Sequence, residues 1–151
     1  MSAAFHWIRI QTFCYPTEDK ELLRAATEEI TGTPEITEEP CEGEHGEIMI
    51  ILEARLSKQK EFAALFRRLG EPVCRWIMED ADNRTDEDCM FYLRLDKQKA
   101  VSSVKEVAHH GDVIAITGKI QSHPARKDVA VSNLREFLEK VLSLPEETPP
   151  S

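Results

Sequence analysis

The chain has 151 residues, of which 41% are hydrophobic and 31% are charged, so it can bury a core of its own and has the composition of a globular protein. It has no apolar run of the roughly 18 residues that a membrane span needs and no signal-peptide pattern at its start, so we expect a cytoplasmic protein. The net charge of −9 argues against a protein that binds nucleic acid over its whole surface.

Hydrophobic periodicity predicts five strands and five helices. A first strand with apolar residues on both faces is typical of the middle of a sheet. We expect Thr17 to cap the helix that follows it and Leu22 to belong to the buried stripe of that helix; Ser57 is the expected cap of the next helix. In chain order, the expected elements are a strand over 4–13, a helix over 18–30, strands over 35–44 and 48–56, helices over 58–69 and 73–81, a strand over 89–95, a helix over 98–107, a strand over 113–121 and a helix from 124 or 125 to about 142.

The order of these elements, β-α-β-β-α-α-β-α-β-α, is not the regular alternation of a parallel sheet. Pro40 is typical of an edge strand, and the turn around Gly43 and Gly46 indicates a hairpin, with an anion held by the backbone N–H groups of that turn as the alternative. Gly118 indicates a bulge or a close backbone approach within the last strand. We therefore expect one α+β domain over residues 1–144, with a mostly antiparallel sheet of about five strands, helices on one face and the other face open; residues 145–151 form a short disordered tail.

The sequence contains no motif for catalysis or for metal binding. The four cysteines are widely spaced and form no C-x-x-C pair, so we expect reduced and mostly buried thiols. The adjacent His109 and His110 lack the spacing of metal ligands, and there is no P-loop or G-x-S-x-G element. We therefore expect a protein that is not an enzyme and that uses no cofactor or metal.

The charge is unevenly distributed along the chain. Residues 1–90 carry 10 Lys and Arg against 20 Asp and Glu, whereas residues 91–135 carry 8 against 4. Basic side chains can neutralise the phosphates of RNA, and aromatic side chains can stack on its bases. The alternative to RNA binding is a plain charged surface. The candidates for RNA binding are Tyr92, Arg94, Lys97, Gln98, Lys99, Lys119, His123, Arg126 and Lys127.

Four segments occur together in one order: HWIRIQTF near the start, EGEHGEIMIILEA at 42–54, DEDCMFYLRLDKQ at 86–98 and GDVIAITGKIQSHPA at 111–125. In these four segments, the chain resembles an archaeal family described as predicted RNA-binding proteins linked to the exosome. The resemblance covers most of residues 5–140. It implies an α+β fold like that of the large-subunit ribosomal protein that contacts the smallest ribosomal RNA. It also implies an RNA-associated protein rather than a nuclease.

The resemblance also points to individual residues. It adds His45 to the RNA-binding candidates and covers Gly43, Gly46, Arg94, Asp96, Lys97, Gln98, Lys119, Pro124 and Ala125. The chain departs from the family at Ala115 and Thr117, where basic or histidine residues often stand, which implies a thinner RNA contact along the last strand.

The leading hypothesis is a non-catalytic RNA-binding accessory factor of RNA processing or degradation, with RNA and exosome or ribonucleoprotein proteins as partners. The alternative is a scaffold or homodimeric protein of a ribonucleoprotein that does not touch RNA itself. A small enzyme that uses His45 with the acidic loop at 82–88 is disfavoured.

Overall fold

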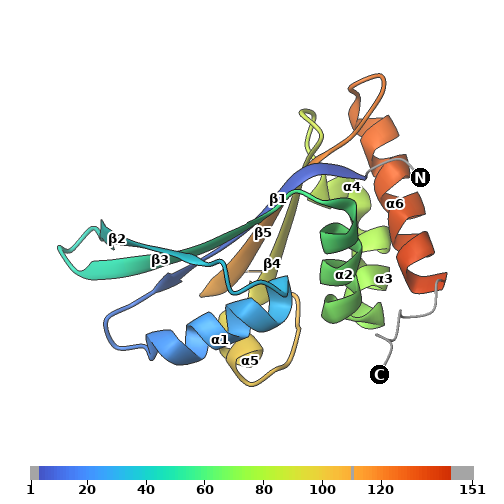
Figure 1. Cartoon of the computed structure of the whole chain (residues 1–151). Coiled ribbons are helices and arrows are strands. Elements are labelled where there is room, and N and C mark those ends of the chain that lie inside the picture. The colour runs from blue at the N-terminus through green and yellow to red at the C-terminus, as the bar shows by residue number, and fades with distance from the viewer. Residues whose placement is uncertain (1–3, 110, 144–151) are drawn as a thin grey trace.

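Five antiparallel strands form one sheet in the order β2-β3-β1-β5-β4 in the computed structural model, which describes residues 4–109 and 111–143 (Figure 1). The strands are β1 Phe5–Cys14, β2 Thr37–Glu42, β3 Ile48–Leu56, β4 Met90–Asp96 and β5 Val113–Ile120. The helices are α1 Lys20–Thr31, α2 Gln59–Leu69, α3 Glu71–Glu79, α4 Ala81–Arg84, α5 Lys97–Val101 and α6 Lys127–Ser143. This architecture confirms the predicted α+β class.

The helices pack on one side of the sheet. Figure 1 shows α1 and α5 beneath one end of the sheet and α2, α3 and α6 beneath the other. None of the described helices is long and apolar enough to cross a membrane. The opposite face of the sheet is left without a helical layer, so its side chains can meet a ligand.

β1 is the central strand, as predicted, but the expected cover on both of its faces is wrong. Its pairing with β5 shifts register between Phe5 and Trp7. This irregularity turns Phe5 to the same side as Ile8 and Ile10, and all three are buried. The apolar positions at the start of β1 therefore face the helices together, and Trp7 remains on the open face.

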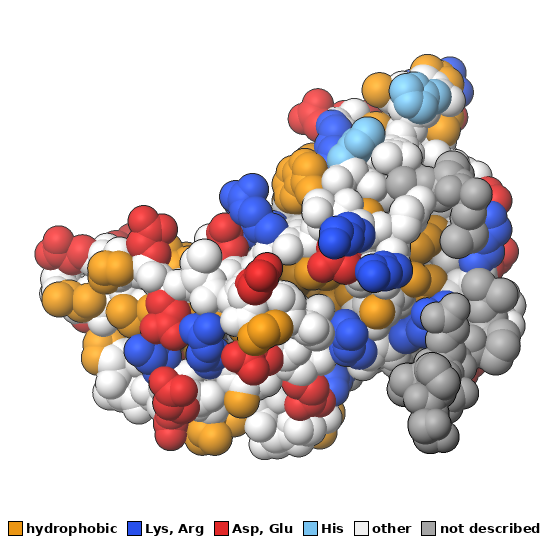
Figure 2. Space-filling view, in the orientation of Figure 1, with side chains coloured by type: hydrophobic (Ala, Val, Ile, Leu, Met, Phe, Trp, Pro, Cys, Tyr) orange, Lys and Arg blue, Asp and Glu red, His pale blue; other side chains and the backbone are white. Residues whose placement is uncertain are grey.

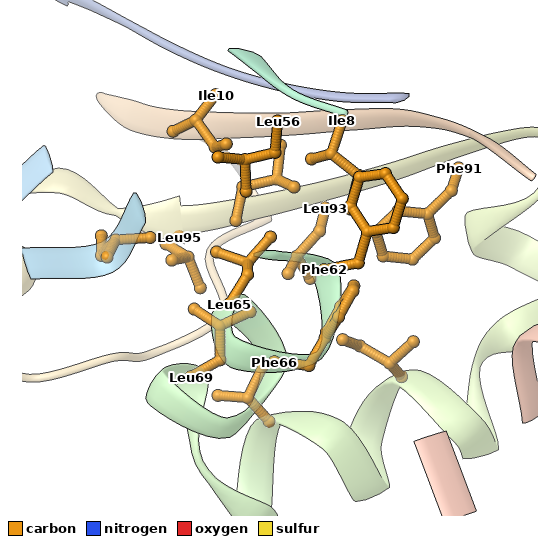
Figure 3. Packing of buried hydrophobic residues seen from close by; sticks show 14 of the residues in the cluster. Ile8, Ile10, Leu56, Phe62, Leu65, Phe66, Leu69, Phe91, Leu93 and Leu95 are labelled. Carbon is orange, nitrogen blue, oxygen red and sulfur yellow. The ribbon is translucent and has the colours of Figure 1, made fainter. Parts of the chain in front are cut away.

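Aromatic rings fill the core between the sheet and the helices. The ring of Phe5 lies 5.7 Å from Phe62, 5.8 Å from Phe66 and 5.9 Å from both Phe91 and Phe137, measured between centroids. Phe62, Phe66 and Phe91 project into the same space in Figure 3. Such ring contacts add to the hydrophobic stabilisation that burial provides, and here they join β1 and β4 to α2 and α6.

Gly118 allows this packing. A Cβ atom at Gly118 would lie 2.9 Å from Cδ1 of Phe5 and 3.2 Å from Cγ1 of Ile8. The close neighbours of Gly118 are therefore the side chains of Phe5 and Ile8 rather than the backbone that the sequence suggested.

The start of α1 differs from the prediction. Asp19, not Thr17, is the N-cap, and its Oδ1 accepts hydrogen bonds from the backbone N–H groups of Glu21 and Leu22, at 3.0 and 3.3 Å. A carboxylate also suits the positive end of the helix dipole. Leu22 is 55% exposed and lies outside the buried stripe, which Leu23 and its neighbours on that face provide.

Two further helix boundaries were predicted wrongly. Lys58 stands at the N-cap of α2 in place of Ser57. The carboxylate of Glu61 accepts hydrogen bonds from the backbone N–H groups of Ser57 and Lys58. The helix expected over 98–107 ends at Val101, because the chain then returns to the outer edge of β4. There Asp96 N–H donates to the carbonyl of Glu106 at 2.8 Å, so that edge is covered.

The remaining elements follow the predicted order with small shifts. The helix expected over 73–81 is α3 followed by the short α4, and the last helix begins at Lys127. The hairpin between β2 and β3 is confirmed, with Pro40 in the edge strand β2. The tail predicted over 145–151 lies outside the described residues.

Candidate nucleic-acid interface

The register of the sheet brings basic and aromatic side chains into one row on the open face. Arg9 of β1 stands opposite Arg55 of β3 on one side and opposite Thr117 of β5 on the other. Thr117 in turn stands opposite Tyr92 of β4. Neighbouring strands are about 4.8 Å apart, so this row of four side chains spans roughly 14 Å.

Two flanking rows extend this surface. Trp7 stands opposite Lys119 two residues along β1 in one direction. Gln11 stands opposite Ala115 in the other direction, and Ala115 is opposite Arg94. We call the resulting surface the sheet-face site, and its members are Trp7, Arg9, Arg55, Tyr92, Arg94 and Lys119.

Two of its cations are free to bind an anion. Among the described residues, Arg9 and Arg94 make no ion pair and no side-chain hydrogen bond. Arg55 is paired with Glu53 of its own strand at 3.1 Å, and its side chain is 69% exposed. Such an exposed pair is worth about 0–1 kcal/mol, so a phosphate can compete for Arg55.

The ring of Tyr92 is held in place at its hydroxyl end. The hydroxyl donates a 3.0 Å hydrogen bond to Oδ2 of Asp86, which raises the pKa of Tyr92. Burial alone would raise the pKa of Asp86, but hydrogen bonds from Met90 N–H, Tyr92 and Asp88 N–H hold it below its usual value. Tyr92 is 43% exposed, so a fixed aromatic surface remains open to a stacking partner.

Lys97 cannot belong to this surface. It is 1% exposed, and its Nζ lies 2.7 Å from Glu18 Oε1, 2.9 Å from the carbonyl of Phe13 and 4.6 Å from the ring centroid of Tyr15. It is the first residue of α5, which lies on the helix side of the sheet. The predicted corner of Arg94 and Lys97 is therefore split between two faces.

The neighbours of Lys97 are exposed but engaged with acidic side chains. Nε2 of Gln98 donates to Glu18 at 3.3 Å, and Lys99 is paired with Glu106. Both come from α5, on the side of the sheet opposite the sheet-face site. The structure does not bring them to Tyr92 and Arg94.

The candidates after β5 lie at the end of the sheet rather than on its face. His123 is exposed in the loop beyond β5, Arg126 is paired with Asp128 at 3.1 Å, and Lys127 opens α6. Lys119 is the member of the basic segment after residue 110 that reaches the sheet-face site, and its Nζ donates to the carbonyl of Asp88.

His45 lies far along the sheet, in the turn between β2 and β3. Its backbone N–H donates to Oε2 of Glu47 at 3.0 Å, and a Cβ atom at Gly43 would clash with Oε1 of the same glutamate. The carboxylate of Glu47 thus lies against the turn where an anion would otherwise sit. This arrangement favours the hairpin interpretation over an anion cradle.

The cysteines are all free, and three of them, Cys14, Cys74 and Cys89, are buried, which agrees with the prediction. Burial raises the pKa of the Cys74 thiol to about 11, so this thiol is unreactive at neutral pH. In the described parts of the chain, no group of three or more His, Cys, Asp and Glu side chains is placed to hold a metal ion.

Sequence reasoning missed Trp7, Arg9 and Arg55 as members of the site. Alternation along each strand was the available signal, because Arg9 and Arg55 each fall between two buried residues. That signal cannot say which strands are neighbours, and it cannot show the register shift after Phe5, which separates Phe5 from the face of Trp7 and Arg9.

A family model described as RNA binding matches residues 7–120. The chain belongs to this RNA-binding family. The matched range of the RNA-binding family begins at Trp7 and ends just after Lys119, so it contains every member of the sheet-face site. His123, Arg126 and Lys127 lie beyond it.

Relatives support the same assignment. The chain is 30% identical over 145 residues to the RNA-binding protein PAB1135 of Pyrococcus abyssi, a match that covers 89% of this chain and 94% of that protein. The structure is similar to that of Mth689 from Methanothermobacter thermautotrophicus, described as a DUF54 protein, with 31% sequence identity and a TM-score of 0.77. The match covers 89% of this chain and 98% of Mth689. The structure is also similar to that of AF2318 from Archaeoglobus fulgidus, with 27% sequence identity and a TM-score of 0.76. That match covers 88% of this chain and 99% of AF2318. The fold that the chain shares with these two structures thus extends over nearly its whole length.

Proposed function

We propose that this protein binds RNA on the sheet-face site and acts without catalysing a reaction, as an accessory factor in RNA processing or degradation. The observation that carries the proposal is the row of Arg55, Arg9, Thr117 and Tyr92 across four strands of a face that no helix covers. Membership of the RNA-binding family supports the choice of ligand.

The chemistry of the surface fits unpaired nucleotides. The guanidinium groups of Arg9, Arg55 and Arg94 match phosphate oxygens, and such contacts need no particular base. The rings of Trp7 and Tyr92 offer faces on which bases can stack. A duplex keeps its bases stacked on one another, so an open sheet with aromatic side chains is better suited to a single-stranded segment.

Charge restricts where RNA can bind. Figure 2 shows Lys and Arg side chains beside a large hydrophobic side chain along the upper surface near the middle of the molecule, whereas acidic side chains dominate over β2 and β3 on the left. The net charge of −9 repels RNA from most of the surface, so a local cluster of cations determines the contact. Association with exosome or ribonucleoprotein proteins, which the sequence resemblance suggests, is part of this proposal.

A charge-matched pair of variants tests the site. In Arg9→Gln/Arg94→Gln, we expect the Kd for a 12-nucleotide oligouridine to rise by about tenfold or more, because two phosphate contacts are lost. The slope of log K against log salt should fall in magnitude by about 1.4. Fluorescence anisotropy over a range of salt concentrations measures both quantities.

The control is Arg75→Gln/Lys140→Gln, which removes the same charge from exposed positions of α3 and α6. It should leave Kd within about twofold of the wild type. An equal loss in both double variants would indicate general electrostatics and contradict the site. Equal affinity for oligouridine and for a 12-base-pair RNA duplex would contradict the preference for unpaired nucleotides.

A further inference from the structure

The hairpin of β2 and β3 differs in chemistry from the rest of the sheet. Residues 37–51, which we call the hairpin arm, contain five glutamates and no lysine or arginine. The arm extends beyond the helices on the left of Figure 1, and Figure 2 shows hydrophobic and acidic side chains gathered over it. The same sheet therefore has a basic, aromatic part and an acidic, apolar part.

Apolar side chains on the arm lack a covering layer. Phe13, on the adjoining strand β1, is 38% exposed, and Met49 and Ile51 are partly buried; Ile48, which is 65% exposed, lies on the opposite face. Phe13 stands opposite Ile51, and Met49 stands opposite Cys41, so these four residues lie close together on the open face. Exposed apolar groups that adjoin one another and have a polar rim are typical of a protein-binding surface.

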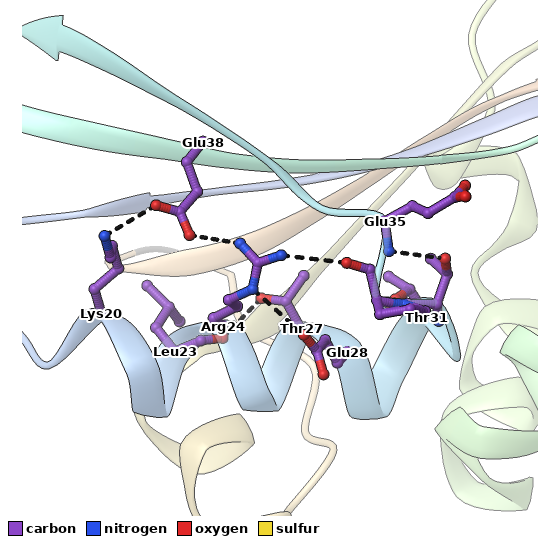
Figure 4. Close-up of polar contacts among 10 residues, drawn as sticks. Lys20, Leu23, Arg24, Thr27, Glu28, Thr31, Glu35 and Glu38 are labelled. Atoms are coloured by element: carbon purple, nitrogen blue, oxygen red, sulfur yellow. Dashed lines mark hydrogen bonds and ion pairs between the residues drawn. The ribbon is translucent and has the colours of Figure 1, made fainter.

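The base of the arm is fixed to α1. Glu38 accepts from Lys20 Nζ at 2.9 Å and from the guanidinium of Arg24, which also donates to the carbonyl of Pro34 at 3.2 Å (Figure 4). These contacts neutralise Glu38 and join the base of the arm to α1. Further out, Glu39 stands opposite Ile51 on the open face and makes no ion pair within residues 4–109 and 111–143, so its charge is available to a partner.

Charge distinguishes between the possible occupants of this surface. RNA is repelled by an arm with five glutamates and no cation. Two copies that meet arm to arm would place glutamates against glutamates. Pro40 removes a backbone donor from the exposed edge of β2, which disfavours addition of a strand from another chain.

We propose that the hairpin arm docks a different protein, whose surface carries lysine and arginine side chains around apolar ones. Apolar contact with Phe13, Met49 and Ile51 supplies the buried area, and Glu39 on the same face complements the basic rim. This docking surface is separate from the proposed RNA site, so RNA and the protein partner bind at two parts of one sheet.

A basic amphipathic peptide serves as the probe. Amide shifts of the full-length protein are followed by NMR while a synthetic 14-residue helical peptide of leucine and lysine is added; a leucine–glutamate peptide is the control. We expect the basic peptide to shift the amides of Cys41, Met49 and Ile51 and to leave that of Arg94 unchanged. The acidic peptide should shift neither group.

Variants with matched charge changes test the contact. Glu39→Gln should raise the Kd of the basic peptide by about threefold or more, whereas Glu42→Gln, on the opposite face of the same hairpin, should change it by less than about twofold. Met49→Ser/Ile51→Ser should also weaken binding at unchanged charge, because the apolar contact is lost. An intact amide spectrum before the peptide is added confirms that each variant is folded.

Three results would overturn the docking surface. The basic peptide could shift amides all over the acidic helices, or added oligouridine could shift the amides of the arm. The amides of the arm could also shift when only the protein concentration is changed. The last would assign the arm to a second copy. Shifts of Arg9 and Arg94 with oligouridine report the RNA site separately, so either proposal can fail without the other.

Discussion

Lys97 and Glu18 are 79 positions apart in the sequence, yet Lys97 Nζ lies 2.7 Å from Glu18 Oε1 inside the protein. The same ammonium group donates to the carbonyl of Phe13 and faces the ring of Tyr15. The contact joins α5 to the connection between β1 and α1. Lys97 is therefore a structural residue, although its sequence context suggested an RNA contact.

Removal of this ammonium group should destabilise the fold. In Lys97→Met, Glu18 and the carbonyl of Phe13 lose their partner, and we expect the free energy of unfolding to fall by roughly 3 kcal/mol. Urea denaturation followed by circular dichroism measures the change. Lys99→Met, which removes the exposed pair with Glu106, should cost less than about 1 kcal/mol. Similar losses in the two variants would contradict the buried role of Lys97.

The same pair makes stability depend on pH. Burial would raise the pKa of Glu18, but hydrogen bonds from Lys97, Tyr15 N–H and Gln98, together with the charge of Lys97, outweigh it and hold the pKa below the ordinary value of 4.5. A carboxylate whose pKa is lowered by folding stabilises the protein above its unfolded pKa. That contribution is lost as the pH falls through the folded pKa.

We therefore expect the stability difference between wild type and Glu18→Gln to be largest near about pH 7 and to shrink below about pH 4.5. Denaturant titrations at several pH values measure it, with Glu139→Gln as the matched exposed control. A difference that stayed constant down to about pH 3 would contradict the role assigned to the Glu18 carboxylate.

Addition of a single methyl group at Gly118 should disturb the core. The new Cβ in Gly118→Ala would lie 2.9 Å from the Phe5 ring, and overpacking of this kind costs about 1–3 kcal/mol. Thermal and urea unfolding measure the loss. In Phe5→Leu/Gly118→Ala, the smaller side chain leaves room for the methyl group, so the two effects should be less than additive. Strict additivity would show that Phe5 is not the neighbour that resists the change.

Stacking on Tyr92 predicts different effects for two substitutions. Tyr92→Ala removes the ring, and loss of one stacked base weakens RNA binding by about 1–3 kcal/mol. Tyr92→Phe keeps the ring and loses only the hydrogen bond to Asp86, so its Kd for oligouridine should stay within about threefold of the wild type. Fluorescence of RNA that contains 2-aminopurine reports stacking directly. Equal losses in both variants would point to the hydroxyl rather than the ring.

Much of the fold could be predicted because its signals are local. The bounds of β3 follow from the apolar run Ile48–Leu56, and the hairpin before it follows from two glycines and Pro40. Helix starts were predicted less well, because neighbouring side chains compete for the same backbone N–H groups. Asp19 prevailed over Thr17, and Glu61 satisfied the N–H groups that Ser57 was expected to serve.

The candidate site was predictable only in part. Tyr92 and Arg94 were placed on the outer face from alternation along one strand, and the structure confirms that both are exposed there. Lys97 could not be separated from them by sequence, since a lysine that follows a strand usually reaches solvent. Arg9 and Arg55 could not be joined to Tyr92, because their contact depends on the order β3-β1-β5-β4.

Local patterns along the chain were sufficient to predict the α+β class, the order of the elements, the edge position of β2 and the outward direction of Tyr92 and Arg94. Each of these depends on propensity, periodicity or turn chemistry within a few residues. Which cations are buried and which share a surface depends on the folded arrangement: Lys97 lies against Glu18, and Arg9 lies between Arg55 and Thr117. Strand register and side-chain burial arise from contacts between distant segments, which the local pattern does not contain.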